Sequence, residues 1–294
     1  MSFDYFNKDI LSEDLLSVYV NIEKHYPNIE YFLQLLSQRV YEFSPFIWNK
    51  MSKDNTIQMR NRHFLCYSLL ISELYESNND INANNSFLLD GLALDFFWYV
   101  YWRHLDNLLD SDLNSPKEEQ ISSLSQLSLE ISWIHDLLFS KYSLPNKEIA
   151  KSYVSKTCDI SKQEKKQPLD KSRIWERGLL HCLVPVAYFQ FCEQKIELLR
   201  RYICAKGLIH DIYDVMDDFK KGTQSVPVSW IYELDLCNLF SPENSAKFFI
   251  KASQELLLSI EAVHSLNSTS QSTIINVLLE ELQKNANNLV SDYA

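Results

Sequence analysis

Glycine is scarce in this chain, with only four among its 294 residues. A β-rich or α/β protein of this length needs more glycine for turns and phosphate-binding loops, whereas long helices with short polar connections need few. The 46% of hydrophobic residues can fill a sizeable core. The sequence therefore predicts an all-α fold. No repeat and no linker-like composition divides it, so we expect residues 1–294 to form one helical domain.

Apolar residues recur at helical spacing along most of the chain, and no segment resembles a strand pair. This periodicity predicts helices over residues 9–25, 29–50, 59–78, 86–110, 117–141, 147–157, 170–196, 197–221, 226–238, 243–265 and 270–291. Pro27, Pro145 and Pro242 fall between these segments, where helices commonly end. Pro185 lies inside the segment 170–196, so we expect it to kink that helix.

Charge and hydropathy argue against two classes of partner. The net charge of −11 argues against nucleic-acid binding, because phosphate backbones are held by clustered Lys and Arg. The most apolar stretch, 87–102, is interrupted by Asp90 and Asp95 and is too short to span a membrane. The first residues lack the pattern of a signal peptide, and the six cysteines form no C-x-x-C pair. We therefore expect a cytoplasmic protein with reduced thiols and no stable membrane insertion.

A first aspartate cluster ends the predicted helix 86–110. Residues four apart on a helix fall on one stripe, so Asp106 and Asp110 share a face. The same stripe continues backwards through Trp102, Tyr99 and Asp95. The run from Phe96 to Trp102 is too apolar for an exposed helix, so we expect these carboxylates to open into an internal cavity.

A second cluster lies in the predicted helix 197–221. Asp211, Asp214 and Asp218 line one side of that helix, with His210 at its margin. Like charges on adjacent turns repel, which suggests that a cation lies between them. Oxygen ligands without Cys or His pairs favour Mg²⁺, which commonly binds through one or two carboxylates and the phosphate oxygens of a substrate. Taken singly, each cluster also fits an acidic, solvated helix end.

A basic segment lies between the two clusters. The Lys-rich residues 162–171 precede Arg173 and Arg177. Such a segment fits an ordinary solvated loop. It also fits a loop that closes over a phosphate site and excludes water.

These features resemble the class I isoprenoid synthases, which comprise prenyl diphosphate synthases, squalene/phytoene synthases and class I terpene synthases. The segment from Asp106 to Asp110 is similar to the first aspartate-rich motif of the family, with Asn107 where a second Asp is more usual. The resemblance covers most of the chain. It implies a helical bundle around an apolar cavity, in which the two carboxylate clusters bind three Mg²⁺ that hold the substrate diphosphate.

The second cluster resembles two branches of the family. His210, Asp214 and Asp218 keep the spacing of the Asn, Ser and Glu triad of terpene synthases, although all three identities differ. The run from Asp214 through Lys221 to Gly222, followed by Pro227, resembles the acidic and basic pattern of squalene/phytoene synthases. Chain-elongating synthases have a comparable aspartate motif.

The resemblance also implies roles for individual residues. Asp106, Asp110, Asp214 and Asp218 would bind Mg²⁺ for catalysis, together with His210 and Asp211. Arg173 resembles the diphosphate-sensing Arg of terpene synthases, with Arg177 as its alternative, and Lys221 would join them at the diphosphate. Phe96, Tyr99 and Trp102 would line the cavity, where aromatic faces can stabilise a carbocation.

We therefore expect a Mg²⁺-dependent class I terpene synthase, a lyase that ionises farnesyl or geranylgeranyl diphosphate and cyclises the carbocation. The sequence leaves open a squalene/phytoene-like head-to-head synthase or a chain-elongating prenyl synthase. A catalytically silent helical subunit is a further alternative, supported by His210 and Asn107. Because many members of the family are dimers, a homodimer is possible.

Overall fold

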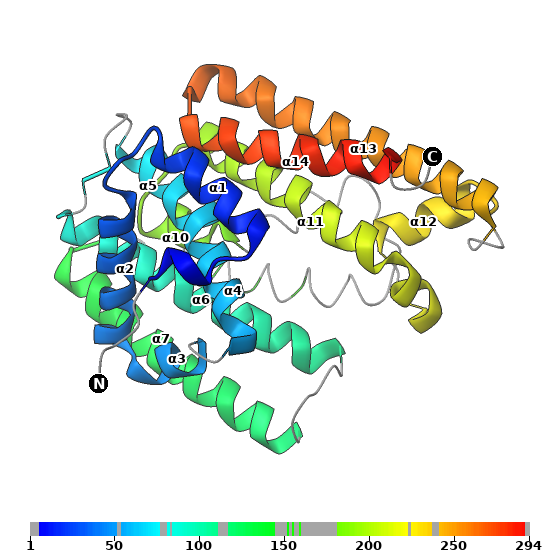
Figure 1. Ribbon diagram of the computed structural model, residues 1–294. Helices are drawn as coiled ribbons and strands as arrows, with labels where there is room; N and C mark the ends of the chain where they lie inside the picture. The colour runs from blue at the N-terminus through cyan, green and yellow to red at the C-terminus, as the bar shows by residue number, and fades with distance from the viewer. Residues whose placement is uncertain are drawn as a thin grey trace. The chain divides into compact units, whose positions relative to one another are not determined.

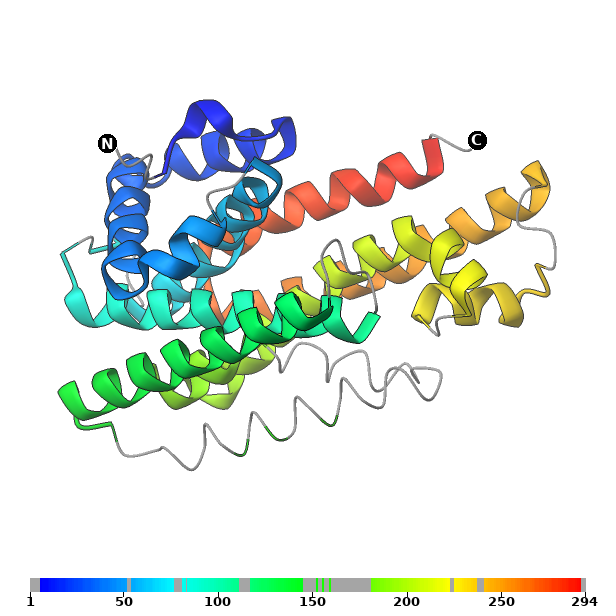
Figure 2. The same cartoon turned by 90° about the horizontal axis from the view of Figure 1, so that it is seen from below.

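The computed structural model describes residues 6–51, 54–76, 81–82, 84–110, 117–144, 152, 155, 159, 181–222, 225–236 and 241–291 (Figures 1 and 2). Within these ranges every regular element is a helix and no strand occurs. None of the described helices combines the length and the apolar character needed to cross a membrane. The predicted all-α class is confirmed, whereas the isoprenoid synthase type and its central cavity stay predictions.

Contacts between residues divide the chain into two compact units. Unit 1 comprises residues 1–150, 183–191 and 272–277, and unit 2 comprises residues 151–182, 192–271 and 278–294. The prediction that residues 1–294 form one domain stays a prediction.

Helix α6 is the central element of unit 1. The described elements of this unit are η1 (Lys8–Ile10), α1 (Glu13–Glu23), α2 (Ile29–Phe43), α3 (Pro45–Met51), α4 (Asp54–His63), the π-helical segment η2 (Phe64–Ser68), α5 (Leu69–Glu76), α6 (Ser86–Asp110), α7 (Lys117–Lys141) and α10 (Leu183–Ala187). α6 contacts α2, α5, η2, α7 and α10, and Figure 2 shows α7 running beside it. A helix that is covered on several sides can be apolar on several sides. Both α6 and α7 have their predicted bounds.

Unit 2 is built around α11. Its described helices are α11 (Glu193–Lys221), α12 (Val226–Glu233), α13 (Pro242–Ser270) and most of α14 (Thr273–Ser291), whose first turn belongs to unit 1. α11 packs against α12 and runs beside α13 (Figure 1). It ends at Gly222, which adopts a left-handed conformation with φ 71° and donates its N–H to the Asp218 and Phe219 carbonyls. Glycine tolerates this conformation, which is why it ends many helices.

The predicted helix over 29–50 is two helices in the structure. α2 ends at Phe43, and α3 begins at Pro45. Ser44 between them is extended, because a residue that precedes proline disfavours the helical conformation. The Ser44 hydroxyl accepts a hydrogen bond from the Ile47 N–H at 3.1 Å and so caps α3. The prediction of one continuous helix is therefore wrong at Ser44.

The predicted helix over 170–196 also breaks within the described residues. α10 begins at Leu183, so Pro185 lies in its first turn, where the missing N–H of proline costs nothing. The expected kink at Pro185 is therefore wrong. The helix ends at Ala187, Gln190 has a positive φ of 53°, and α11 starts at Glu193.

Glu73 of α5 holds the start of α14 within unit 1. Its buried carboxylate accepts hydrogen bonds from the Thr273 N–H at 2.8 Å and from the Ile274 N–H at 3.1 Å. It also accepts from the hydroxyls of Tyr26 and Ser272. A carboxylate at this position satisfies N–H groups that the helix leaves unpaired and interacts favourably with the helix dipole.

Candidate functional site

The first aspartate cluster lies at the C-terminal end of α6. The helix continues to Asp110, so the backbone of Asp106 and Asp110 has the spacing of four residues that the sequence predicts. Their side chains lie outside the part of the chain that the structure describes. Their role as metal ligands therefore stays a prediction.

Asp95, on the same stripe of α6, is a buried residue with a protein partner. Its Oδ2 atom lies 3.2 Å from Nε2 of His63, and both side chains are buried. The geometry is not that of a hydrogen bond, and the His63 ring stacks on Tyr99 with 4.4 Å between centroids. Burial raises the pKa of the Asp95 carboxyl, although His63 acts in the opposite direction. Asp95 is thus part of the packed interior of unit 1, and nothing in the sequence pattern pointed to His63 as its neighbour.

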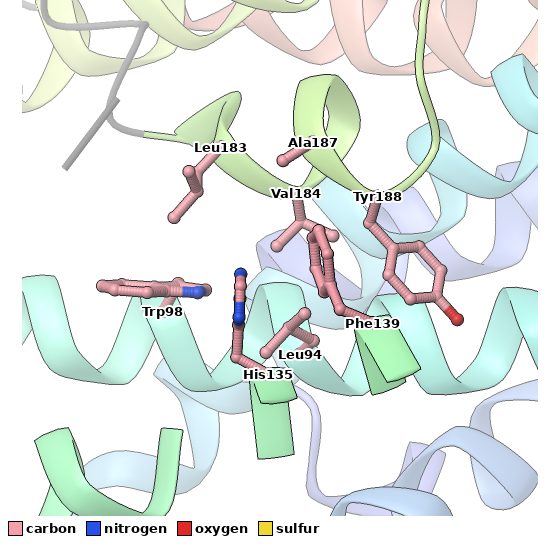
Figure 3. Close-up of a pocket in the computed structure, with 8 residues that line it drawn as sticks. All are labelled: Leu94, Trp98, His135, Phe139, Leu183, Val184, Ala187 and Tyr188. Carbon is pink, nitrogen blue, oxygen red and sulfur yellow. The ribbon is translucent and has the colours of Figure 1, made fainter. Parts of the chain in front are cut away.

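A small apolar pocket lies between α6, α7 and α10 of unit 1 (Figure 3). The space between the atoms there is about 150 Å³, part of it open to solvent, and it is lined by Leu94, Trp98, His135, Phe139, Leu183, Val184, Ala187 and Tyr188. Ligand pockets usually measure about 300–1,000 Å³. The side chains that line this pocket leave no room among them for even a water-sized molecule, so it is far smaller than an ordinary ligand site.

Two polar rings lie among the apolar side chains of this pocket. Figure 3 shows His135 beside Trp98, whose indole nitrogen lies on the side toward the imidazole. The buried Nε1 of Trp98 has no hydrogen-bond partner among the described residues. The His135 ring stacks on Phe139 with 4.0 Å between centroids. Sequence analysis did not select His135 or Phe139, and their spacing of four residues on α7 was the only available signal.

Gly91 allows the segment after α10 to approach α6 closely. A Cβ atom on Gly91 would lie 2.4 Å from Cζ of Phe189 and 2.5 Å from Cε1 of Tyr188. The Tyr188 hydroxyl donates to the Phe87 carbonyl at 3.0 Å, and the two rings stack. Burial raises the pKa of Tyr188 far above its usual range. These contacts hold one wall of the pocket against α6.

The three predicted cavity residues, Phe96, Tyr99 and Trp102, do not line this pocket. Phe96 is fully buried and packs against His63. Trp102 is buried and stacks on Trp98, with 6.0 Å between ring centroids. Their assignment to a substrate cavity stays a prediction.

The second aspartate cluster lies on α11, which runs without a break through all of its members. Asp214 and His210 are exposed, whereas Asp211 and Asp218 are half-buried. The side of α11 that packs in unit 2 carries Ile209, Ile212 and Val215 instead, and these are buried. α11 therefore directs its row of aspartates away from its packed side.

No described group of three or more His, Cys, Asp and Glu side chains is arranged to hold a metal ion. His210, Asp211, Asp214 and Asp218 are among the described side chains, whereas the side chains of Asp106 and Asp110 are not. Asp217, which is off the row, lies 3.9 Å from Lys220.

The predicted diphosphate ligands are only partly described. Arg173 and Arg177 lie outside the described residues. Lys221 is exposed at the last position of α11, where the partial negative charge of a helix C-terminus favours a cation. This location accounts for a lysine at position 221 even if no ligand binds there, and it is also compatible with a bound diphosphate.

Asp90 forms an ion cluster that sequence analysis missed. Its fully buried carboxylate accepts hydrogen bonds from Arg39 Nη1 at 2.6 Å, Lys141 Nζ at 2.8 Å and the Tyr142 hydroxyl at 2.6 Å. The hydrogen bond to Asp90 raises the pKa of Lys141. In the sequence Asp90 was only an interruption of an apolar stretch, and its partners lie far away along the chain. The cluster ties α2, α6 and the end of α7 together.

Comparison of the chain with protein-family models, curated proteins and solved structures finds no match. The resemblance to class I isoprenoid synthases therefore rests on the residues and spacings of this chain alone.

Proposed function

We propose that this chain is a Mg²⁺-dependent class I terpene synthase that ionises an allylic prenyl diphosphate, such as farnesyl or geranylgeranyl diphosphate. The observation that carries the proposal is the row of Asp211, Asp214 and Asp218 on an unbroken α11, directed away from the packed side of that helix. Repelling carboxylates on adjacent turns add nothing to helix stability. Their placement is understandable if they bind a cation.

The chemistry of these side chains fits Mg²⁺. They offer carboxylate oxygens, and neither a thiolate nor a pair of imidazoles stands among them. Mg²⁺ keeps several waters when it binds to protein, so exposed and half-buried carboxylates suit it better than a closed cage would. We propose that Asp106 and Asp110 of α6 contribute further ligands, with His210 at the margin of the row and three ions bound in all.

The residues of this chain would act on the diphosphate mainly by charge. Bound Mg²⁺ would neutralise the negative charge that develops on the leaving diphosphate. Arg173, Arg177 and Lys221 would bind the same group through charge-assisted hydrogen bonds. The carbon–oxygen bond breaks with its electron pair on the diphosphate, which leaves an allylic cation.

The allylic cation must then be kept from water while it cyclises. A dry, aromatic environment does this, because ring faces stabilise a cation without forming a bond to it. Unit 1 is rich in such rings around α6, and Phe96, Tyr99 and Trp102 are the ones we propose for the cavity. The small pocket beside Trp98 would need to widen or to join further space to hold a whole prenyl chain.

The head-to-head synthase branch is the second candidate, because the run from Asp214 to Pro227 matches its pattern. In the structure, however, Gly222 ends α11 and Pro227 lies in the first turn of α12. Both residues therefore have a role in helix termination or initiation in any protein with these helices. This part of the pattern adds little weight to that branch, so we keep terpene cyclisation as the first proposal.

A catalytically silent helical subunit is the third candidate. The small volume of the described pocket favours it, because a prenyl chain needs more room. Such a subunit would keep the fold and bind no diphosphate.

The test is to incubate the purified protein with Mg²⁺ and geranyl, farnesyl or geranylgeranyl diphosphate, with and without isopentenyl diphosphate. Released pyrophosphate and the extracted products, identified by gas chromatography–mass spectrometry, would be measured. A cyclic hydrocarbon or alcohol from one substrate alone is the expected result. Longer diphosphates or a head-to-head dimer would transfer the chain to a sister branch.

Matched variants decide whether the clusters carry the activity. Asp106→Ala/Asp110→Ala and Asp214→Ala should each lower pyrophosphate release at least about a hundredfold. Asp217→Ala, on the same helix as Asp214 but off the row, should retain it. Wild-type protein that neither releases pyrophosphate nor binds the diphosphates in calorimetry would contradict the proposal and favour the silent subunit.

A further inference from the structure

Gly207 lies in the interior of α11 (Glu193–Lys221), where a glycine is a poor choice for stability. Glycine loses more backbone freedom on folding than any other residue, so it stabilises a helix less than alanine does. The chain has only four glycines among its 294 residues. A glycine in the middle of its longest packed helix of unit 2 therefore calls for a physical reason.

The other two described glycines have such a reason in the fold. Gly91 lets Phe189 approach α6, because a Cβ atom there would lie 2.4 Å from Cζ of Phe189. Gly222 ends α11 in a left-handed conformation. Gly207 has ordinary helical backbone angles, and apart from the neighbouring turns of α11 no atom of the described residues lies within 4 Å of the position of its missing Cβ. The described part of the fold would accept a side chain at this position.

Gly207 continues the aspartate row of α11 by one turn toward the start of the helix. Asp211, Asp214 and Asp218 follow it by four, seven and eleven residues. At about 100° per residue, all three lie within about 40° of the line along the helix that passes through Gly207. The rise of about 1.5 Å per residue sets Gly207 about 6 Å along the axis from Asp211. The open space at Gly207 therefore adjoins the carboxylates.

Before Gly207 the same side of α11 is apolar. Ile203 and Cys204, which precede it by four and three residues, flank the line through Gly207, and both are buried. One turn further back, Arg200 is half-buried and lies 3.0 Å from the Glu197 carboxylate. This side of the helix therefore changes from carboxylates to open space at Gly207 and then to one turn of apolar side chains.

The space at Gly207 suits carbon atoms better than a charged group. The N–H groups of a helix interior are used in the hydrogen bonds of the helix itself, so the backbone at Gly207 offers no donor to an anion. Mg²⁺ and the phosphate oxygens that it binds belong at the carboxylates. A ligand that lies along this side of α11 would thus have its charged end at the aspartates and an apolar part at Gly207.

We propose that Gly207 is a specificity-determining residue, against which the first carbon atoms of a prenyl diphosphate lie, in the space that a side chain would fill. It rests on the function proposed above, because the charged end of that substrate must bind at the aspartate row. Gly207 would then distinguish a prenyl diphosphate from the bare diphosphate. The row alone would bind both.

The experiment is to measure, by calorimetry in the presence of Mg²⁺, how the full-length wild type, Gly207→Ala and Gly207→Leu bind two probes. Inorganic pyrophosphate represents the charged end alone. Farnesyl thiolodiphosphate, in which sulfur replaces the oxygen of the bond that breaks, represents the whole substrate. The dissociation constant of this analogue should rise about tenfold in Gly207→Ala and at least about a hundredfold in Gly207→Leu, because the added side chain fills its space. Pyrophosphate binding should stay within about twofold of the wild-type value.

Thermal unfolding separates this role from a structural one. Both variants should unfold about 1–2 °C above the wild type, because alanine and leucine are better helix formers and the described residues leave room for them. Tyr213→Leu is the matched control: Tyr213 is 59% exposed on the same helix, about 120° around it from Gly207. This variant should bind both probes like the wild type.

Two results would overturn the role of Gly207 and leave the proposed function standing. One is a Gly207→Leu protein that binds the analogue as tightly as the wild type does. The other is a folded Gly207→Leu protein that loses pyrophosphate along with the analogue, because the diphosphate would then occupy the space at Gly207. Gly207→Ala carries the same test if leucine lowers the unfolding temperature. A wild-type protein that binds neither probe would overturn the proposed function, and the role of Gly207 with it.

Discussion

The carboxylates in the core of unit 1 and those on α11 of unit 2 are the same chemical groups in opposite settings. Asp90 and Glu73 are buried, and each accepts several hydrogen bonds from side chains or backbone N–H groups. Asp211, Asp214 and Asp218 lie on the side of α11 that faces away from its packed residues. The first group is held by hydrogen bonds in the core of unit 1, whereas Asp214 of the second group is exposed.

This difference separates two kinds of acidic residue that look alike in a sequence. A buried carboxylate is tolerated only if positive or hydrogen-bonding groups compensate for its lost hydration. Replacing it should therefore cost stability, with any effect on function indirect. Asp214 on α11 is exposed, so its replacement should cost the fold little and should affect mainly the binding of a ligand.

The largest effect on stability is expected from Asp90→Ala. Asp90 is fully buried, and its loss leaves Arg39 and Lys141 without their carboxylate. Removing one partner of a buried ion pair costs about 3–5 kcal/mol, and the partial exposure of both cations places this case near 3 kcal/mol. Urea unfolding would measure the change. Asp217→Ala is the control and should change the free energy of unfolding by less than about 0.5 kcal/mol.

If Asp90→Ala lowers the free energy of unfolding by less than about 1 kcal/mol, the cluster contributes no more to stability than a surface ion pair does. The contrast between the two settings would then not hold for Asp90.

The converse prediction concerns Asp214→Ala on α11. Pyrophosphate release should fall at least about a hundredfold, the effect of losing one electrostatic contact to the leaving group. The free energy of unfolding should stay within about 0.5 kcal/mol of the wild-type value or rise slightly, because one repelling charge is gone. Pyrophosphate assays and urea unfolding of the same preparation would check both halves. Destabilisation without loss of activity would reverse the roles assigned to the two groups.

Glu73→Gln should lower the free energy of unfolding by about 2 kcal/mol, which is less than the effect of Asp90→Ala. The glutamine keeps one acceptor oxygen, but its amide would face the N–H donors of Thr273 and Ile274 that the carboxylate now binds. The favourable charge at the start of α14 would also be lost. Hydrogen exchange should show faster opening of the first turn of α14, with little change in α7. Uniform acceleration over unit 1 would contradict this local role.

The long helices of this chain could be predicted from sequence because their periodicity persists over many turns. α6 and α7 have their predicted bounds, and α11 ends at the predicted residue. The errors fall where a local rule competes with an apolar run. Ser44 breaks a helix because proline follows it. Pro185 lies in the first turn of α10, whereas the apolar run had predicted it in the middle of a longer helix.

The candidate site could be predicted only where it depends on one helix. The positions of Asp211, Asp214 and Asp218 along α11 follow from helical spacing alone, and the structure contains that helix. The partners of Asp90 and Asp95 could not be predicted, because each comes from another helix that chain folding brings near. The same holds for the pocket, where Tyr188 meets residues of α6 and α7 that are distant in sequence.

The smallest effect is expected from Asp95, where two influences on one carboxylate oppose each other. Burial raises its pKa above the ordinary value of 3.8, and the nearby His63 lowers it. Because burial is the larger of the two influences, the folded protein retains a proton on Asp95 above pH 3.8 that the unfolded chain has lost. Stability therefore falls as the pH rises through this range. The free energy of unfolding of the wild type relative to Asp95→Asn should therefore decrease with rising pH and level off above the pKa of the folded state. Urea unfolding of both proteins at closely spaced pH values would measure this difference. A difference that increases with pH would show that His63 holds Asp95 as a carboxylate, in a buried ion pair like that of Asp90.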